Sequence, residues 1–132
     1  MERRSISSGA PWEPVIGYSR GVRVGPHVHV AGTTAWDEHG KIVSVGDPYG
    51  QALQTLRNIE RALRALDAAP SDVVRTRIYL TNMDDWEQVA KAHREFFGAV
   101  RPVNTLLEVP KLVVPEMLVE IEAEAIVANA QS

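Results

Sequence analysis

The clearest alternation of apolar and polar positions lies in the last third of the chain. Within Leu118–Val127, the residues Glu120, Glu122 and Glu124 alternate with aliphatic residues. Successive side chains of a strand point to opposite faces, so the pattern predicts a strand with one carboxylate face and one apolar face. A shorter strand is predicted at Asn104–Val109, and a proline-containing loop connects the two.

Two segments have apolar residues at the three- and four-residue spacing of an amphipathic helix. The first, Pro48–Asp67, follows Asp47, a favourable N-cap, and has an aliphatic stripe opposite an arginine-rich face. The second runs from Asp84 to Gly98, and we expect that glycine to adopt the left-handed conformation just after the helix. Its predicted apolar stripe comprises Trp86, Val89, Ala90, His93 and Phe97.

The remaining strands are short and are separated by turns that contain glycine and proline. Gly25-Pro26 suits a tight hairpin, and Gly9–Pro14 is predicted to be a loop. The expected order of elements is β-β-β-α-β-α-β-β, which indicates a single α+β domain over residues 1–132, with both helices on one face of a mixed sheet. The expected strands are Ser5–Ser8 at an edge, Tyr18–Val24, His27–Thr33 and Val73–Leu80.

The strand Val73–Leu80 also divides into two faces. If it neighbours the last strand, Arg75 and Arg77 can pair with Glu122 and Glu124 across the sheet. A face that mixes arginine, glutamate, tyrosine and aliphatic residues is typical of a subunit contact, so we expect oligomerisation through the helix-free face. The side chains expected to face the helices are Val74, Ile78 and Leu80.

Composition mainly excludes classes of function. The chain has 132 residues, 45% hydrophobic and 23% charged, with a net charge of −3 and no cysteine. Disulfides, thiolate metal sites and cysteine nucleophiles are therefore excluded, and no basic patch suggests a nucleic-acid partner. No apolar run approaches the roughly 20 residues of a membrane span, and the first residues lack the apolar core of a signal peptide. We expect no membrane partner and a cytoplasmic location.

Several segments together resemble the RidA/YjgF family. They are GVRVGPHVHVAGTTA, QALQTLRNIERALRAL, VVRTRIYLTNMDDW and the ending VEIEAEAI, so the similarity extends from about Tyr18 to Val127. The resemblance implies a chorismate-mutase-like fold and a homotrimer whose sheets build a central barrel. It also implies small-molecule ligands in clefts between subunits. Its best-known members hydrolyse reactive enamines and imines to ammonia and a 2-keto acid, without a metal or organic cofactor.

Carried over by position, the resemblance assigns a set of candidate site residues. The cleft tyrosine is matched by Tyr18, the glycine of the third strand by Gly32, and the glutamate that holds a water near the ligand by Glu120. The serine that precedes the glycine is replaced by Ala31. These matches predict that Glu120 acts as a general base that orients water towards an electrophilic C=N carbon. Backbone amides near Thr105 and Gly32 would position the ligand.

One position departs from the deaminating members, which carry an arginine that binds the substrate carboxylate. Here that position is Asn104, and Leu106 replaces a cysteine found two residues later in many members. Loss of a charge-assisted hydrogen bond costs about 1.5–3 kcal/mol, so 2-imino acids are expected to be poor substrates unless another cation substitutes. Arg101, just before the strand, is the nearest candidate. Asn104 itself suits a ligand with a neutral carbonyl, amide or hydroxyl.

Three functions stay open at this level. The chain is an enamine or imine hydrolase with altered substrate choice, a non-catalytic small-molecule-binding or regulatory trimer, or an endoribonuclease. The negative net charge and the lack of a basic groove disfavour the third. Each candidate also has a structural interpretation: Glu120 facing solvent, Tyr18 packed in the core, and Asn104 serving as a hydrogen-bonding residue at a strand end.

Overall fold

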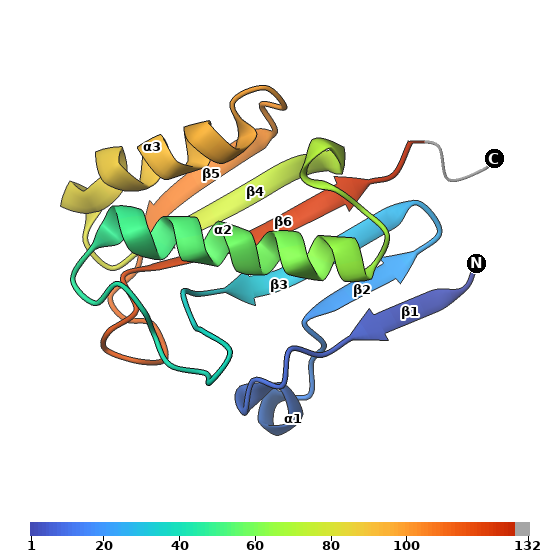
Figure 1. The fold of residues 1–132 in the computed structure, drawn as a ribbon, viewed down its shortest axis with the longest axis horizontal. Helices are drawn as coiled ribbons and strands as arrows, with labels where there is room; N and C mark the ends of the chain where they lie inside the picture. The colour runs from blue at the N-terminus through green and yellow to red at the C-terminus, as the bar shows by residue number, and fades with distance from the viewer. Residues whose placement is uncertain (129–132) are drawn as a thin grey trace.

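The computed structural model describes residues 1–128, which form one six-stranded mixed sheet (Figure 1). The strand order is β1-β2-β3-β6-β4-β5. Neighbouring strands are antiparallel except β4 and β5, which are parallel. The strands are β1 (Arg3–Ile6), β2 (Gly21–Val24), β3 (His27–Thr33), β4 (Val73–Leu80), β5 (Val103–Glu108) and β6 (Val119–Ile126).

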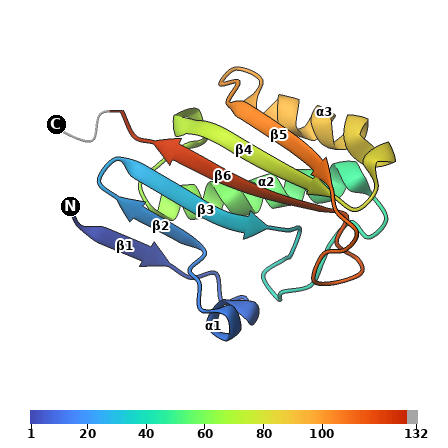
Figure 2. The same cartoon turned by 180° about the vertical axis from the view of Figure 1, so that it is seen from behind.

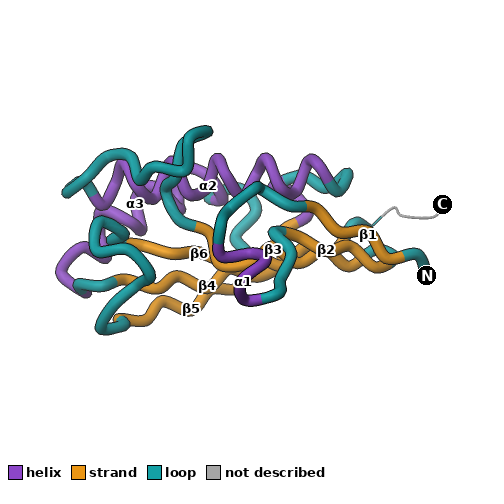
Figure 3. The backbone as a smooth tube through the Cα atoms, turned by 90° about the horizontal axis from the view of Figure 1, so that it is seen from below, coloured by secondary structure: helices purple, strands orange, loops and turns teal. Residues whose placement is uncertain are grey.

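Two long helices, α2 (Pro48–Ala65) and α3 (Trp86–Phe97), cover one face of the sheet. Figure 3 shows the resulting two layers, and Figure 2 shows the opposite face without helices. The predicted α+β architecture with two helices on one face is thereby confirmed. Short helical segments are α1 (Trp12–Ile16), η1 (Pro70–Asp72) and η2 (Met83–Asp85). No helix among residues 1–128 is long and apolar enough to cross a membrane.

The core lies between these layers and is centred on β6. The aliphatic positions of β6 are buried and pack against the apolar stripe of α2. This helix begins as predicted, because the Asp47 side chain accepts a 3.1 Å hydrogen bond from the Gly50 amide, with Pro48 as the first helical residue. The fully buried contacts between the layers come from Val119 and Ile121 of β6 and from Leu56, Ile59 and Leu63 of α2.

The charged face of the sheet also matches its prediction. Arg77 Nη1 lies 3.1 Å from Glu122 Oε1 and 3.4 Å from Glu124 Oε2. Arg75 Nε lies 3.6 Å from Glu124 Oε1. These pairs form because β4 and β6 are antiparallel neighbours in which Arg75 is opposite Glu124 and Arg77 is opposite Glu122. The helix-free face is therefore a layer of alternating opposite charges.

The prediction for one core residue of β4 is wrong. Val74 was expected to face the helices, but it is 42% exposed, whereas Val73 is only 3% exposed. The pairing of β4 with β6 shifts register between Val73 and Arg75, as at a β-bulge. An extra residue at a bulge reverses the alternation on its far side, and this is why Val73 rather than Val74 packs under the helices.

The predicted N-terminal loop is also wrong in part. The segment expected to be irregular contains α1, which ends at Gly17 with a φ of 88°. The edge strand lies at Arg3–Ile6, slightly before the predicted Ser5–Ser8. Gly17 donates its amide to the Glu13 carbonyl at 2.8 Å, so a single helical turn closes here.

The end of α3 differs from its prediction as well. Gly98 is right-handed, with a φ of −58°, and the left-handed residue is Arg101, with a φ of 56°. The Arg101 amide donates a 2.8 Å hydrogen bond to the Phe97 carbonyl, so the chain reverses three residues later than expected. Trp86 is 48% exposed and does not belong to the buried stripe, whereas Ala92 is fully buried.

Candidate functional site

A cavity of about 240 Å³ lies where β3 ends, between α1 and the loop that joins β5 to β6. Its wall is largely apolar, with a few polar residues among the lining. A concave apolar site with a few convergent polar groups is the usual form of a small-molecule site. The polar residues are Tyr18, Arg20, Thr34 and Glu120, and the wall also includes Trp12, Trp36 and Met117.

Glu120 is the carboxylate of this cavity. It lies on β6 and, among residues 1–128, has no hydrogen-bond or ion-pair partner. Burial raises the pKa of its carboxyl group above the ordinary value of 4.5; the charge of Arg20 opposes this shift and that of Glu122 adds to it. A desolvated carboxyl group without a partner is suited to exchange protons with a ligand.

Gly32 makes room for that carboxyl group. A Cβ atom at Gly32 would overlap the Glu120 carboxyl oxygen Oε2. The pairing of β3 with β6 shifts register between Val30 and Thr33, at the same level of the sheet. The missing side chain therefore allows the acid on β6 to lie directly against the backbone of β3.

Arg20 is the positive charge of the site, and the sequence analysis did not single it out. Its side chain is 2% exposed and lies just before β2. Its guanidinium donates to the Gly32 carbonyl at 2.6 Å, to Thr33 Oγ1 at 3.2 Å and to the Tyr18 hydroxyl at 3.2 Å. The predicted strand Tyr18–Val24 would have placed residue 20 on the same face as Tyr18, but in the structure both residues precede β2, which begins at Gly21.

The countercharge of Arg20 is Glu13 in α1. Glu13 is 4% exposed, and its Oε2 lies 3.5 Å from Arg20 Nε. Burial raises the pKa of the Glu13 carboxyl, but hydrogen bonds from Ser8 and Ser7 and the charge of Arg20 outweigh burial and lower it overall. Both members of the buried pair are thus charged, and the serine hydroxyls hold the Glu13 carboxylate in place.

The other predicted site residues do not reach this cavity within one chain. Asn104, Arg101 and Thr105 belong to β5 or to the segment before it, and β4 separates β5 from β6. A second hollow of about 390 Å³ is lined by Asn104 and Arg101 together with residues of α3. Thr105 is opposite Arg77 in the parallel pairing of β4 and β5. The candidate residues therefore fall into two groups, one around the Glu120 cavity at β3 and β6 and one at the edge strand β5.

Asn104 is an exposed residue whose amide makes a partly buried contact with Thr76. Its Nδ2 donates a 3.0 Å hydrogen bond to Thr76 Oγ1, which lies 2.9 Å from His93 Nε2. Burial lowers the pKa of His93, so its ring is neutral at pH 7. The amide nitrogen of Asn104 is thus engaged with its own chain rather than pointing out as a free donor.

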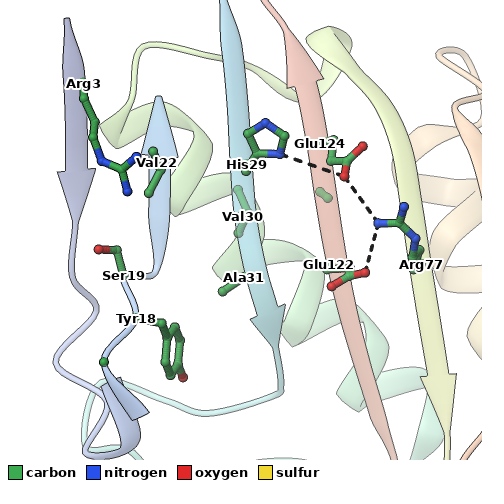
Figure 4. A pocket seen from close by; sticks show the side chains of 12 residues that line it. Arg3, Tyr18, Ser19, Val22, His29, Val30, Ala31, Arg77, Glu122 and Glu124 are labelled. Atoms are coloured by element: carbon green, nitrogen blue, oxygen red, sulfur yellow. Dashed lines mark hydrogen bonds and ion pairs between the residues drawn. The ribbon is translucent and has the colours of Figure 1, made fainter. Parts of the chain in front are cut away.

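The helix-free face carries a larger, open hollow of about 480 Å³, to which Tyr18 also contributes. Figure 4 shows His29, Glu124, Arg77 and Glu122 in a row across β3, β6 and β4. His29 Nδ1 lies 3.9 Å from Glu124 Oε2. Among residues 1–128, no three His, Cys, Asp or Glu side chains are placed together as metal ligands.

Comparisons with known proteins agree with the fold described above. The family model described as Endoribonuclease L-PSP matches residues 9–127. The crystal structure of Rv2704 from Mycobacterium tuberculosis, a member of the YjgF/YER057c/UK114 family, has a TM-score of 0.87 at 45% identity and covers 96% of this chain and 100% of its own. The YjgF gene product of E. coli has a TM-score of 0.80 at 26% identity, with coverage of 93% and 98%.

A curated relative leads to the same family. A RutC family protein of Pyrococcus horikoshii is 32% identical over 126 residues, which are 95% of this chain and 98% of that protein. The family model spans most of the chain, and this relative is more than 30% identical over nearly the whole of both chains. The chain therefore belongs to the RidA/YjgF family, the family that the L-PSP model describes.

Proposed function

We propose that this protein binds a small metabolite at the cavity around Glu120 and hydrolyses an enamine or imine there, without a metal or organic cofactor. The observation that carries the proposal is the Glu120 carboxyl group, which has no partner among residues 1–128 and a raised pKa. It lies against Gly32 in an apolar cavity. An acid without a partner in such a cavity fits proton transfer better than fold stability, because even partial burial of an unpaired carboxylate costs free energy of folding.

The proposed chemistry needs only Glu120 and water. The ionised carboxylate accepts a proton from water as the oxygen attacks the C=N carbon and passes that proton to the nitrogen, which gives a neutral carbinolamine. The carboxylate then accepts the proton of the new hydroxyl group and passes it to the nitrogen, as the C=O bond forms and the C–N bond breaks to release ammonia. An imine and one water thus yield a carbonyl compound and ammonia, and Glu120 ends as it began. A pKa closer to neutrality favours a group that must both accept and donate a proton.

The complete site is proposed to lie between subunits of a homotrimer. Large apolar side chains are exposed on β5, where Val103 is 57% and Leu107 49% exposed. Others surround the Glu120 cavity, where Ile16 and Val113 are each 69% exposed. Docking of β5 of one copy against the cavity of the next would cover both sets. It would also bring the Asn104 group to the Glu120 group, which one chain keeps apart.

Substrate choice is proposed to differ from that of members with an arginine at the Asn104 position. The Asn104 amide donates to Thr76, and Arg20 is neutralised by Glu13. Asn104 carries no charge and the charge of Arg20 is already paired, so neither residue offers an unpaired cation to a substrate carboxylate. Arg101 is the remaining candidate. We expect a ligand whose recognised group is a neutral carbonyl, amide or hydroxyl rather than a carboxylate.

A binding or regulatory trimer without turnover is the second candidate, and the same Asn104 contact supports it. An endoribonuclease is less well supported, because the net charge is −3 and the arginines of the sheet face are paired with glutamates. A protein that holds a polyanion would be expected to present unpaired cations.

The test compares ammonia release from two substrates generated in situ, 2-aminoacrylate and its primary amide. We expect the wild-type protein to accelerate hydrolysis of the amide more than that of the acid, and Glu120→Gln to abolish both accelerations. Calorimetry with the stable carbonyl products measures binding separately. Binding without acceleration of either substrate would support the non-catalytic alternative, and equal rates for wild type and Glu120→Gln would refute the proposed role of Glu120.

A further inference from the structure

The most deeply buried cation of the site has no role in the chemistry proposed above. Arg20 is 2% exposed and ranks among the largest side chains that are fully buried. A buried guanidinium is costly unless each of its contacts compensates for lost water. Its partners therefore indicate what the charge is used for.

The contacts of Arg20 divide between an anchor and the cavity. On the anchor side, Nε lies 3.5 Å from Glu13 Oε2 and 3.3 Å from Ser8 Oγ. On the cavity side, the two Nη atoms donate to the Gly32 carbonyl and to the Tyr18 hydroxyl. The guanidinium is thus fixed from the N-terminal segment and directed at two residues that line the cavity.

Arg20 also stacks against the aromatic walls. Its guanidinium carbon lies 5.6 Å from the centre of the Tyr18 ring and 5.7 Å from the centre of the Trp36 ring. Both distances fall within the range of cation–π contacts. A planar group held by hydrogen bonds and by two rings has little freedom to move, so its charge has a fixed position relative to Glu120.

We propose that Arg20 is a positioning residue of this site: anchored by Glu13, it orients the Tyr18 hydroxyl and the Gly32 carbonyl and holds a fixed positive charge in the cavity that Glu120 also lines. The role rests on the proposed function of Glu120 but acts through it. Arg20 itself does not contact the reacting atoms, because its guanidinium is engaged with its own chain on both sides.

The surroundings of Glu120 make Arg20 the charge that stabilises its ionised form. Glu122 on the same strand disfavours ionisation, and Tyr79 on β4 is the register partner of Glu120. Gly32 on β3 carries no charge. Arg20 lines the same cavity as Glu120, and its charge lowers the Glu120 pKa against the effect of burial. Without Arg20, a larger share of Glu120 would be protonated and unable to act as a base.

The test is a direct titration of Glu120 that needs no substrate. Protein labelled with ¹³C at glutamate side-chain carboxyls is titrated by NMR, and Glu120→Gln identifies the Glu120 resonance. The variant Glu13→Gln/Arg20→Gln removes both charges of the buried pair, so that neither is left unpaired. We expect its Glu120 midpoint to lie at a higher pH than that of the wild type. Arg20→Lys keeps a charge on a shorter side chain, and its midpoint should fall between the two.

Arg23→Gln is the matched control. Arg23 is a cation on β2 whose guanidinium donates to the carbonyls of Leu66 and Asp67, away from the cavity. Its loss should leave the Glu120 midpoint in place. An equal rise in Arg23→Gln would show that the Glu120 midpoint responds to the loss of an arginine far from the cavity, and would overturn the proposal. If the double variant does not fold, Glu13→Gln/Arg20→Met, which fills the space with an uncharged side chain, takes its place, and an unchanged midpoint there contradicts the proposal.

The outcome is separable from the proposed hydrolysis. A midpoint that rises as expected, with no ammonia release from the two test substrates, refutes the hydrolase but leaves Arg20 as the group that sets Glu120. Ammonia release that depends on Glu120, with a midpoint that is insensitive to Arg20, refutes the positioning role and leaves the hydrolase standing.

Discussion

The carboxyl group of Glu120 occupies the space that a side chain at Gly32 would need. At this point the Glu120 side chain of β6 packs directly against the backbone of the neighbouring strand β3. An acid is held at the end of the sheet, against backbone, without a hydrogen bond from residues 1–128. The arrangement gives a sharp expectation for a change of one methyl group.

Gly32→Ala should push the Glu120 carboxyl away from the β3 backbone. We expect a loss of less than about 1 kcal/mol in the free energy of unfolding, because the carboxyl is the end of a flexible, partly buried side chain that can move aside, and loss of any activity that depends on its position. Chemical denaturation of four proteins measures it: wild type, each single variant and Gly32→Ala/Glu120→Ala. The cost of Gly32→Ala should shrink in the Glu120→Ala background. An undiminished cost there would show that the methyl group clashes with something else.

Acidification should affect catalysis and stability through Glu120 in opposite directions. A base must be ionised, so ammonia release should fall as the pH drops through a midpoint above the ordinary glutamate value of 4.5. Because the pKa of Glu120 is raised in the folded state, ionisation of Glu120 lowers the stability of the folded protein at neutral pH. This penalty disappears at a pH below the pKa of Glu120 in the unfolded state. Glu120→Gln should therefore be more stable than wild type at pH 7, and the two should converge on acidification. Thermal unfolding across pH measures this difference.

Asn104→Arg should restore recognition of a carboxylate. A charge-assisted contact is worth about 1.5–3 kcal/mol, so the kcat/KM for 2-aminoacrylate should rise roughly ten- to a hundredfold relative to that for its amide. Asn104→Leu serves as the control, because it removes the same hydrogen bond to Thr76 without adding a charge. No gain in Asn104→Arg would mean that the cleft differs from that of the deaminases at more than this position.

The proposed trimer predicts a sedimentation mass near three times the 14.6 kDa of the chain. Arg77→Glu should weaken the assembly, since Arg77 neutralises both Glu122 and Glu124 on the helix-free face. Arg64→Glu makes the same charge change on α2, away from that face, and should leave the mass unchanged. A monomeric wild-type protein would refute both the interface and the shared site.

The sequence predicted what depends on strict periodicity. The alternation of Glu120, Glu122 and Glu124 determined the faces of β6, and the pairing with Arg75 and Arg77 followed from strand adjacency. The two long helices were equally visible, because their apolar stripes extend over several turns. In such segments local propensity and tertiary packing favour the same structure.

Features that depend on a single residue, rather than on a repeating apolar pattern, could not be predicted from the sequence. A bulge has no compositional signature, so the exchange of Val73 for Val74 in the core was not visible. Arg20 was missed for a related reason, because its burial relies on Glu13, and arginine is normally read as a surface residue. The resemblance suggested Tyr18, Gly32 and Glu120 as a group, but the attachment of Asn104 to Thr76 required the structure.

The buried ion pair gives the first residues of the chain an importance that their position does not suggest. Ser7 and Ser8 bind Glu13, Glu13 binds Arg20, and Arg20 reaches the wall of the cavity. Under the proposed role of Arg20, loss of the contacts of Ser7 and Ser8 would also change the acidity of Glu120. Substitutions at Ser7 or Ser8, neither of which lines the cavity, are therefore expected to alter the titration of Glu120.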